Sequence, residues 1–135
     1  MATIRKEIDL GVGVDAVWDA VRDFVHVDKR LAPGFVVESL ADPDTANGVA
    51  RLVTFFNGLK AREPLVSCND ATRRLVYGAT GGRASHYNAS VEVIDAGSGR
   101  SRLIWTIDIL PEALAGPIGQ MVEHAAEIMK KTLEG

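Results

Sequence analysis

Cysteine is nearly absent from this 135-residue chain, which contains only Cys68. A single cysteine cannot form an internal disulfide, and it suits a reducing compartment. Histidine is also scarce, and His26, His86 and His124 show none of the spacings of metal-ligand motifs. We therefore expect no metal site and no bound cofactor.

Long apolar runs are missing as well. No stretch approaches the roughly 20 residues of a membrane span, and the N-terminus lacks the apolar segment of a secretion signal. The net charge is only −3 and the basic residues are dispersed, which argues against nucleic acid or an anionic membrane as a partner. No glycine-rich loop opens a helix, so a phosphate loop is excluded. These absences predict a cytoplasmic protein without a membrane span.

The remaining composition is that of one soluble domain covering residues 1–135, with 47% hydrophobic and 24% charged residues. Residues 3–10 alternate between apolar and charged side chains, as in a strand with one buried face. Helical spacing follows over residues 14–25, and a second short helix is expected at 26–31. Six further strands are expected at residues 35–40, 49–56, 59–67, 73–79, 86–94 and 101–110. The pairs Asn47-Gly48 and Asn57-Gly58 mark turns, and the second predicts a two-residue hairpin turn.

The end of the chain predicts a long helix over residues 112–134. Its apolar side chains recur every three or four residues, which indicates one buried face. They are Ile118, Met121, Val122, Ala125, Ile128 and Met129. Gly116 and Pro117 are poor helix formers, so we expect the helix to begin at Pro117 or to kink there.

This order of elements predicts an α+β fold with one strand, two short helices, six strands and a long helix. Consecutive hairpins favour an antiparallel meander of seven strands. The last helix must bury its apolar face, and the inner face of the sheet is the large apolar surface available. A seven-stranded sheet wrapped around one helix easily leaves an internal cavity, which is the usual kind of ligand site.

Several short segments in the chain also follow the order and spacing of a known family. They are residues 14–18 (VDAVW) before Arg22-Asp23-Phe24, Pro33-Gly34, residues 48–51 (GVAR), Asn57-Gly58 before Glu63, residues 73–77 (RRLVY) and residues 99–105 (GRSRLIW). Together they resemble the START-like superfamily of helix-grip proteins, also called SRPBCC, which includes birch-pollen allergens and plant hormone receptors. Within it the chain is most similar to the bacterial polyketide cyclase/dehydrase-like group. The resemblance covers essentially the whole chain and implies an apolar cavity for a lipid, sterol, polyketide or other aromatic ligand.

The inner faces of the expected strands and helix supply the candidate ligand-binding residues. Tyr77, Tyr87 and Trp105 share the apolar faces of three strands, and each combines an apolar ring with a polar tip. The full candidate set is Phe55, Tyr77, Tyr87, Trp105, Met121, His124 and Ala125. The alternative for all of them is ordinary core packing, which the pattern alone does not exclude.

Arg51 and Glu63 are the charged candidates for a catalytic role. They lie on the two strands joined by the Asn57-Gly58 turn, at nearly opposite positions. If both face inward they form a costly buried pair, which points to a polar group on the ligand. If both face outward they form an ordinary surface pair. Strand alternation does not decide, because Leu52 and Phe56 make the opposite face apolar too.

Three functions fit these features. The first is a carrier or sensor that binds a small hydrophobic molecule, as a monomer or a homodimer. The second is a cyclase or dehydratase that acts on a polyketide-like substrate, with a polar group of the cavity moving a proton. The third is a protein-interaction module, which a large exposed apolar patch would favour.

Overall fold

The computed structural model describes residues 1–44, 46 and 48–135, so Asn47 of the predicted Asn47-Gly48 turn lies outside the described residues. Seven strands and several helices follow one another along these residues. They are β1 (Ala2–Leu10), α1 (Val14–Arg22), η1 (Phe24–His26), α2 (Val27–Arg30), β2 (Val36–Ala41), β3 (Ala50–Phe55), β4 (Lys60–Asn69), β5 (Arg74–Gly78), β6 (His86–Gly97), β7 (Arg100–Leu110), η2 (Glu112–Leu114) and α3 (Ala115–Glu134).

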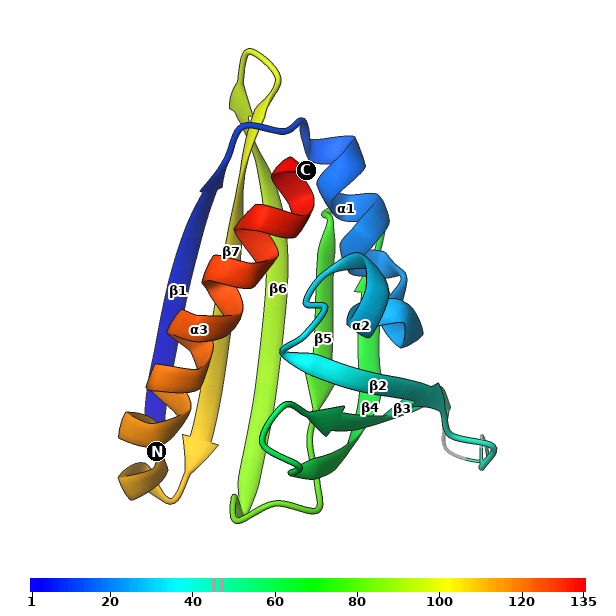
Figure 1. Ribbon diagram of the computed structural model, residues 1–135, viewed down its shortest axis with the longest axis vertical. Helices are drawn as coiled ribbons and strands as arrows, with labels where there is room; N and C mark the ends of the chain where they lie inside the picture. The colour runs from blue at the N-terminus through cyan, green and yellow to red at the C-terminus, as the bar shows by residue number, and fades with distance from the viewer. Residues whose placement is uncertain (45, 47) are drawn as a thin grey trace.

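The strands form an open antiparallel sheet in the order β1-β7-β6-β5-β4-β3-β2. The first strand of the chain therefore pairs with the last, and the other strands follow as a meander. Figure 1 shows α3 crossing in front of the long strands β1, β7 and β6. α1, α2 and the short β2 lie to the right of α3 in this view. This arrangement is the predicted α+β helix-grip fold.

The apolar faces predicted for the strands point inward. On β7 the buried side chains alternate through Leu103, Trp105, Ile107 and Ile109, and on β6 Ala89, Val91 and Val93 do the same. α3 buries Val122, Ala125, Ala126 and Met129 against this face. Within the described residues, no helix is long and apolar enough to cross a membrane.

The start of α3 differs from the prediction. The helix begins at Ala115, after the short η2, and not at Pro117. Pro117 therefore lies in the first turn, where backbone N–H groups have no acceptor within the helix. Proline costs little there, because the hydrogen bond that it lacks would not form in any case.

The turn between β3 and β4 also differs from the prediction. The Phe55 N–H donates to the Leu59 carbonyl at 2.8 Å, so the turn contains three residues, 56–58, rather than two. Gly58 ends it with a φ of +84°, the left-handed conformation that closes such turns. The predicted two-residue turn is therefore wrong by one residue, and this shifts the register of the two strands.

Hydrogen bonds to one carboxylate tie α1 to the turn between β4 and β5. Asp70, in the turn between β4 and β5, accepts a hydrogen bond from Nε1 of Trp18 at 2.8 Å. It also accepts from Nε of Arg22 at 2.9 Å. α1 is thereby tied to the β4–β5 turn, while its buried side chains pack into the same core as those of α3.

Candidate functional site

A cavity of about 1100 Å³ lies between the inner face of the sheet, α3 and the short helices. Most of its wall is apolar, and Phe24, Phe35, Val91 and Ile109 are typical members. The exposed lining residues belong to the β3–β4 turn, the loop of residues 80–83 and the first half of α3. The entrance therefore lies between these three segments.

The cavity wall includes most of the side chains singled out from the sequence. Those that line it are Arg51, Phe55, Glu63, Tyr77, Tyr87, Trp105, Met121 and His124. Ala125 does not line the cavity: it is fully buried, packed within the core on the sheet side of α3. Its small side chain lets the helix approach the strands closely.

Arg51 and Glu63 face inward and form a buried ion pair. They occupy directly opposed positions on β3 and β4 and are only 7% and 6% exposed. Nε and Nη2 of Arg51 lie 2.8 Å and 2.7 Å from Oε1 of Glu63. Both contacts use the same oxygen, so Arg51 does not engage Oε2.

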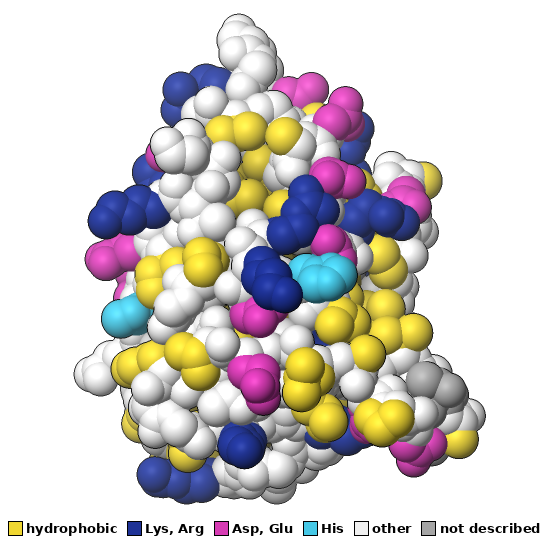
Figure 2. Space-filling model, turned by 45° about the vertical axis from the view of Figure 1, so that its right-hand side comes forward, with side chains coloured by type: hydrophobic (Ala, Val, Ile, Leu, Met, Phe, Trp, Pro, Cys, Tyr) yellow, Lys and Arg dark blue, Asp and Glu magenta, His cyan; other side chains and the backbone are white. Residues whose placement is uncertain are grey.

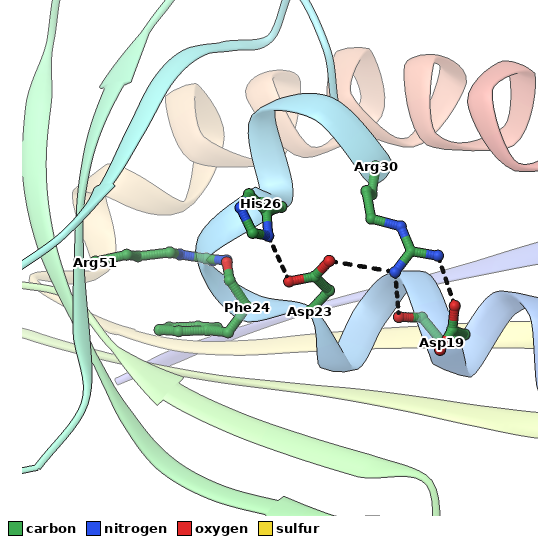
Figure 3. Close-up of polar contacts among 6 residues, drawn as sticks. All are labelled: Asp19, Asp23, Phe24, His26, Arg30 and Arg51. Atoms are coloured by element: carbon green, nitrogen blue, oxygen red, sulfur yellow. Dashed lines mark hydrogen bonds and ion pairs between the residues drawn. The ribbon is translucent and has the colours of Figure 1, made fainter.

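The guanidinium of Arg51 has further partners that connect it to the short helices. Nη1 donates to the backbone carbonyl of Phe24 at 2.7 Å. The guanidinium carbon also lies 3.9 Å from the centre of the Phe24 ring and 5.0 Å from that of Tyr77, which are cation–π distances. Figure 3 shows Arg51 reaching from its strand to Phe24. Arg51 thus satisfies its buried charge with a carboxylate, a carbonyl and two aromatic faces.

The buried environment changes the acidity of the groups around this pair. Burial raises the pKa of Glu63, and the Arg51 guanidinium opposes this rise without cancelling it. Burial also raises the pKa of Tyr77 to about 12, helped by the negative charge of Glu63. The pKa of Tyr87 is raised well above its usual value, chiefly by burial and then by its neighbour Tyr77. Both phenols therefore keep their protons at neutral pH.

Trp105 adds a buried indole N–H. Its Nε1 has no acceptor of good hydrogen-bond geometry among the residues that the structure describes. The Tyr77 phenol is its nearest candidate acceptor, because a hydrogen bond with Trp105 acts against the burial that raises the pKa of Tyr77. Tyr77 and Tyr87 also belong to this part of the wall, and the centres of their two rings are 6.3 Å apart. The polar side chains of the cavity wall are thus gathered in one region, around Arg51, Glu63, the two tyrosines and Trp105.

A network of charged side chains supports the helical segment that carries Phe24. Oδ1 of Asp23 accepts a hydrogen bond from Nδ1 of His26 at 2.7 Å, and its other oxygen accepts from Arg30. Arg30 also bonds Oδ2 of Asp19, as Figure 3 shows. Burial acts to raise the pKa of Asp23, but the hydrogen bonds from His26 and Arg30 outweigh it and hold the pKa below its usual value. His26 is exposed and does not line the cavity, so its role is to help hold this helical segment in place.

An aromatic cluster stands at the entrance. The Phe56 ring stacks on His124 of α3, with ring centres 5.1 Å apart and planes 3° from parallel. Phe35 packs against both rings, at 5.6 Å and 5.8 Å. Sequence reasoning included His124 among the candidate ligand-binding residues but missed the two phenylalanines. Only the position of the β3–β4 turn relative to α3 brings the three rings together.

Other kinds of site receive little support. Within residues 1–44, 46 and 48–135, no three acidic, cysteine or histidine side chains are grouped to hold a metal ion. Partial burial and the charge of Asp70 raise the pKa of the Cys68 thiol, which disfavours the nucleophilic thiolate. Figure 2 shows hydrophobic side chains at the surface beside the β2–β3 loop, and the exposed ones on these strands include Val37, Leu40 and Leu52. They are interspersed with charged groups.

Comparisons with known proteins agree with this fold. The model of the family described as "Polyketide cyclase / dehydrase and lipid transport" matches residues 1–135. No curated protein sequence matches the chain. An uncharacterised protein of Bacillus thuringiensis superposes with a TM-score of 0.80 at 18% identity, over 98% of this chain and 96% of its own.

Two further solved structures are similar. A protein of Thermobifida fusca has a TM-score of 0.74 at 23% identity, over 98% of this chain and 95% of its own. Norcoclaurine synthase of Thalictrum flavum, solved as a point mutant with a transition-state analogue, has a TM-score of 0.70 at 17% identity, over 98% and 93%. At such identities these likenesses show the fold alone.

Proposed function

The chain belongs to the polyketide cyclase/dehydrase and lipid transport family, and we propose that it binds a small hydrophobic or aromatic ligand, such as a lipid, a sterol or a polyketide-like molecule, in its cavity. The observation that carries the proposal is the cavity itself. About 1100 Å³ of space behind a mostly apolar wall is large enough for a ligand of several fused rings. Filling it would bury apolar surface on both molecules.

The polar groups of the wall fit a ligand that is mainly apolar. Arg51 and Glu63 largely neutralise each other, and both tyrosines are uncharged at neutral pH. A strongly charged ligand would therefore find no free opposite charge in this part of the wall. A hydrophobic molecule with one or two polar atoms matches it better.

The proposal is tested by titration with the neutral fluorophore N-phenyl-1-naphthylamine. We expect its emission to rise on binding and the thermal midpoint of the protein to increase, since a ligand of the folded form stabilises it. Ile118→Trp, which places a large ring at the cavity wall on α3, should weaken binding at least tenfold. Glu127→Trp is the matched control, because Glu127 is exposed on the same helix and does not line the cavity. A probe that moves neither signal would count against the proposal.

An enzyme of the cyclase or dehydratase type is the second candidate. It is favoured by the carboxylate of Glu63, which faces the cavity beside two protonated phenols. A raised carboxyl pKa and a positioned phenol are features of general acid–base sites. Turnover of a poly-β-keto substrate tests this role. If Arg51→Ala and Glu63→Gln both turn over such a substrate as fast as the unmodified protein, these residues are not catalytic.

A further inference from the structure

The entrance of the cavity carries large apolar side chains that are open to solvent. Phe56 begins the β3–β4 turn and Leu59 follows it, and these side chains are 48% and 57% exposed. Both line the cavity, as do the partly exposed Ile118 and Met121 on the first half of α3. Apolar surface left in water forfeits the free energy of burial. Such a cluster around one opening therefore marks a surface that meets an apolar partner.

Positive charge flanks these apolar side chains. Lys60 follows Leu59, and Arg83 lies in the loop between β5 and β6; both are exposed and line the cavity. Neither cation forms an ion pair in the part of the chain that the structure describes. Among the exposed lining residues that are described, none is acidic. The net charge of −3 is a sum over the whole chain and does not record this local excess of positive charge.

The segments that carry these side chains lie at one end of the molecule. In Figure 1 the β3–β4 turn, the loop between β5 and β6 and the start of α3 all lie in the lower half of the view. They border the same cavity, so the exposed apolar side chains and the two cations surround one opening. We call Phe56, Leu59, Lys60 and Arg83 the docking rim.

We propose that the docking rim binds the surface of a membrane that contains anionic lipids. Phe56 and Leu59 enter the boundary between headgroups and acyl chains, and Lys60 and Arg83 lie beside the lipid phosphates. A protein partner fits this surface less well, because it would close the entrance of the cavity. A bilayer dissolves hydrophobic molecules and would leave the entrance facing them. The proposal goes beyond ligand binding, and it is tested with vesicles alone.

Cosedimentation with sucrose-loaded vesicles measures the docking. We expect the unmodified protein to bind vesicles that contain about 30% phosphatidylserine, and to bind vesicles of phosphatidylcholine alone about tenfold more weakly, since cations near an anionic surface strengthen binding. Raising the salt concentration from about 0.1 M to about 0.5 M should weaken binding to the anionic vesicles, because it screens these charges.

A pair of double variants assigns the charge dependence. Lys60→Ala combined with Arg83→Ala should remove most of the preference for phosphatidylserine. Lys29→Ala combined with Lys131→Ala is the matched control, because it removes the same charge from two exposed lysines that do not line the cavity. This control should keep the preference. The thermal midpoint of each variant verifies that it is folded.

Insertion of the turn is measured with an added tryptophan. The emission of Leu59→Trp should be quenched by anionic vesicles whose acyl chains carry bromine. Val66→Trp is the control, because Val66 is 65% exposed on β4 and lies outside the cavity wall, so its added ring should stay unquenched. Both variants contain the same native tryptophans, and a difference between them reports on the added ring.

The proposal is overturned if the protein binds neither kind of vesicle or binds both equally. A preference that survives in the Lys60/Arg83 double variant, or an unquenched Leu59→Trp, also overturns it. A second copy of the chain is the competing occupant: a dimer that Leu59→Ser dissociates would make the rim a protein interface instead. The proposed function is judged separately, by binding of N-phenyl-1-naphthylamine without vesicles. Either proposal can therefore fail while the other stands.

Discussion

Arg51 lies directly opposite Glu63 because the turn that joins their strands contains three residues. A two-residue turn at Asn57-Gly58 would place Phe56 opposite Leu59 and hence Arg51 opposite Pro64. The third residue shifts the pairing by one, and the positive φ of Gly58 makes it possible. The backbone conformation of Gly58 thus decides which residues pair as Arg51 and Glu63, which lie seven residues before it and five residues after it.

Gly58→Ala is therefore expected to destabilise the protein by about 1–2 kcal/mol, the cost of left-handed backbone for a residue with a Cβ. No atom lies within 4 Å of the position that the Cβ would take, so the cost comes from the backbone alone. Gly58→Asn should cost less, because asparagine tolerates this conformation. Gly119→Ala on α3 is the control and should stabilise slightly. Urea unfolding measures all three, and equal effects of Ala at both positions would contradict the argument.

The ion pair predicts a difference between single and double substitutions. Arg51→Met leaves the Glu63 carboxylate buried without its partner, and we expect a loss of about 3–5 kcal/mol in the free energy of unfolding. Arg51→Met combined with Glu63→Leu removes both charges and should be clearly more stable than the single variant. Arg102→Met, which breaks the exposed pair with Asp9, is the control and should have a much smaller effect. If the double variant is less stable than the single one, the unpaired buried carboxylate of Glu63 is not the cause of the destabilisation in Arg51→Met.

The two tyrosines predict a distinctive response to alkali. Tyr77 and Tyr87 are the only tyrosines of the chain, so phenolate absorbance near 295 nm reports on them alone. With the pKa of Tyr77 at about 12 and that of Tyr87 well above 10, almost no phenolate should form at pH 10.5 while the protein is folded. In urea both should titrate near pH 10.

The raised pKa values of the two tyrosines also make the stability of the fold depend on pH in the alkaline range. A phenol whose pKa is higher in the folded than in the unfolded state stabilises the fold fully below pH 10, and this contribution is lost as the pH rises toward 12. For Tyr77 the loss amounts to about 3 kcal/mol. Thermal midpoints measured between pH 9 and pH 12 should therefore fall, and Tyr77→Phe should flatten the decline. A normal titration near pH 10 in the folded protein would contradict the buried position of both rings.

Much of the fold followed from the sequence because apolar periodicity is a local signal. The alternation through Leu103, Trp105, Ile107 and Ile109 identified the inner face of β7, and the stripe of α3 identified its buried side. These patterns reflect which side chains leave water, and burial decides the orientation of strands and helices. The positions of Tyr77, Tyr87 and Trp105 in the cavity wall follow from the same signal.

Other features depended on register and distant packing, which no local pattern records. The orientation of Arg51 and Glu63 could not be predicted, because both faces of β3 carry apolar residues and the turn length was wrong by one. Ala125 was predicted to contact the ligand, yet in the structure it packs in the core. The apolar stripe of α3 is wide enough to face both the core and the cavity, and the spacing alone does not say which of its residues faces which. The contact between Phe24 and Arg51 joins residues 27 positions apart and depends on how the short helices meet β3.

The stack of Phe56 on His124 predicts control of ligand exchange. These two rings join the β3–β4 turn to α3 at the entrance, and Phe56 is partly exposed, so its removal should open the rim without emptying the core. We expect Phe56→Ala to raise both the association and the dissociation rate of N-phenyl-1-naphthylamine several-fold, with little change in affinity. Stopped-flow fluorescence measures both rates. Leu52→Ala is the control, because Leu52 is exposed on β3, the strand that leads into this turn, and lies outside the cavity wall. A change in affinity with unchanged association would instead mean that Phe56 contacts the bound ligand and does not limit its passage.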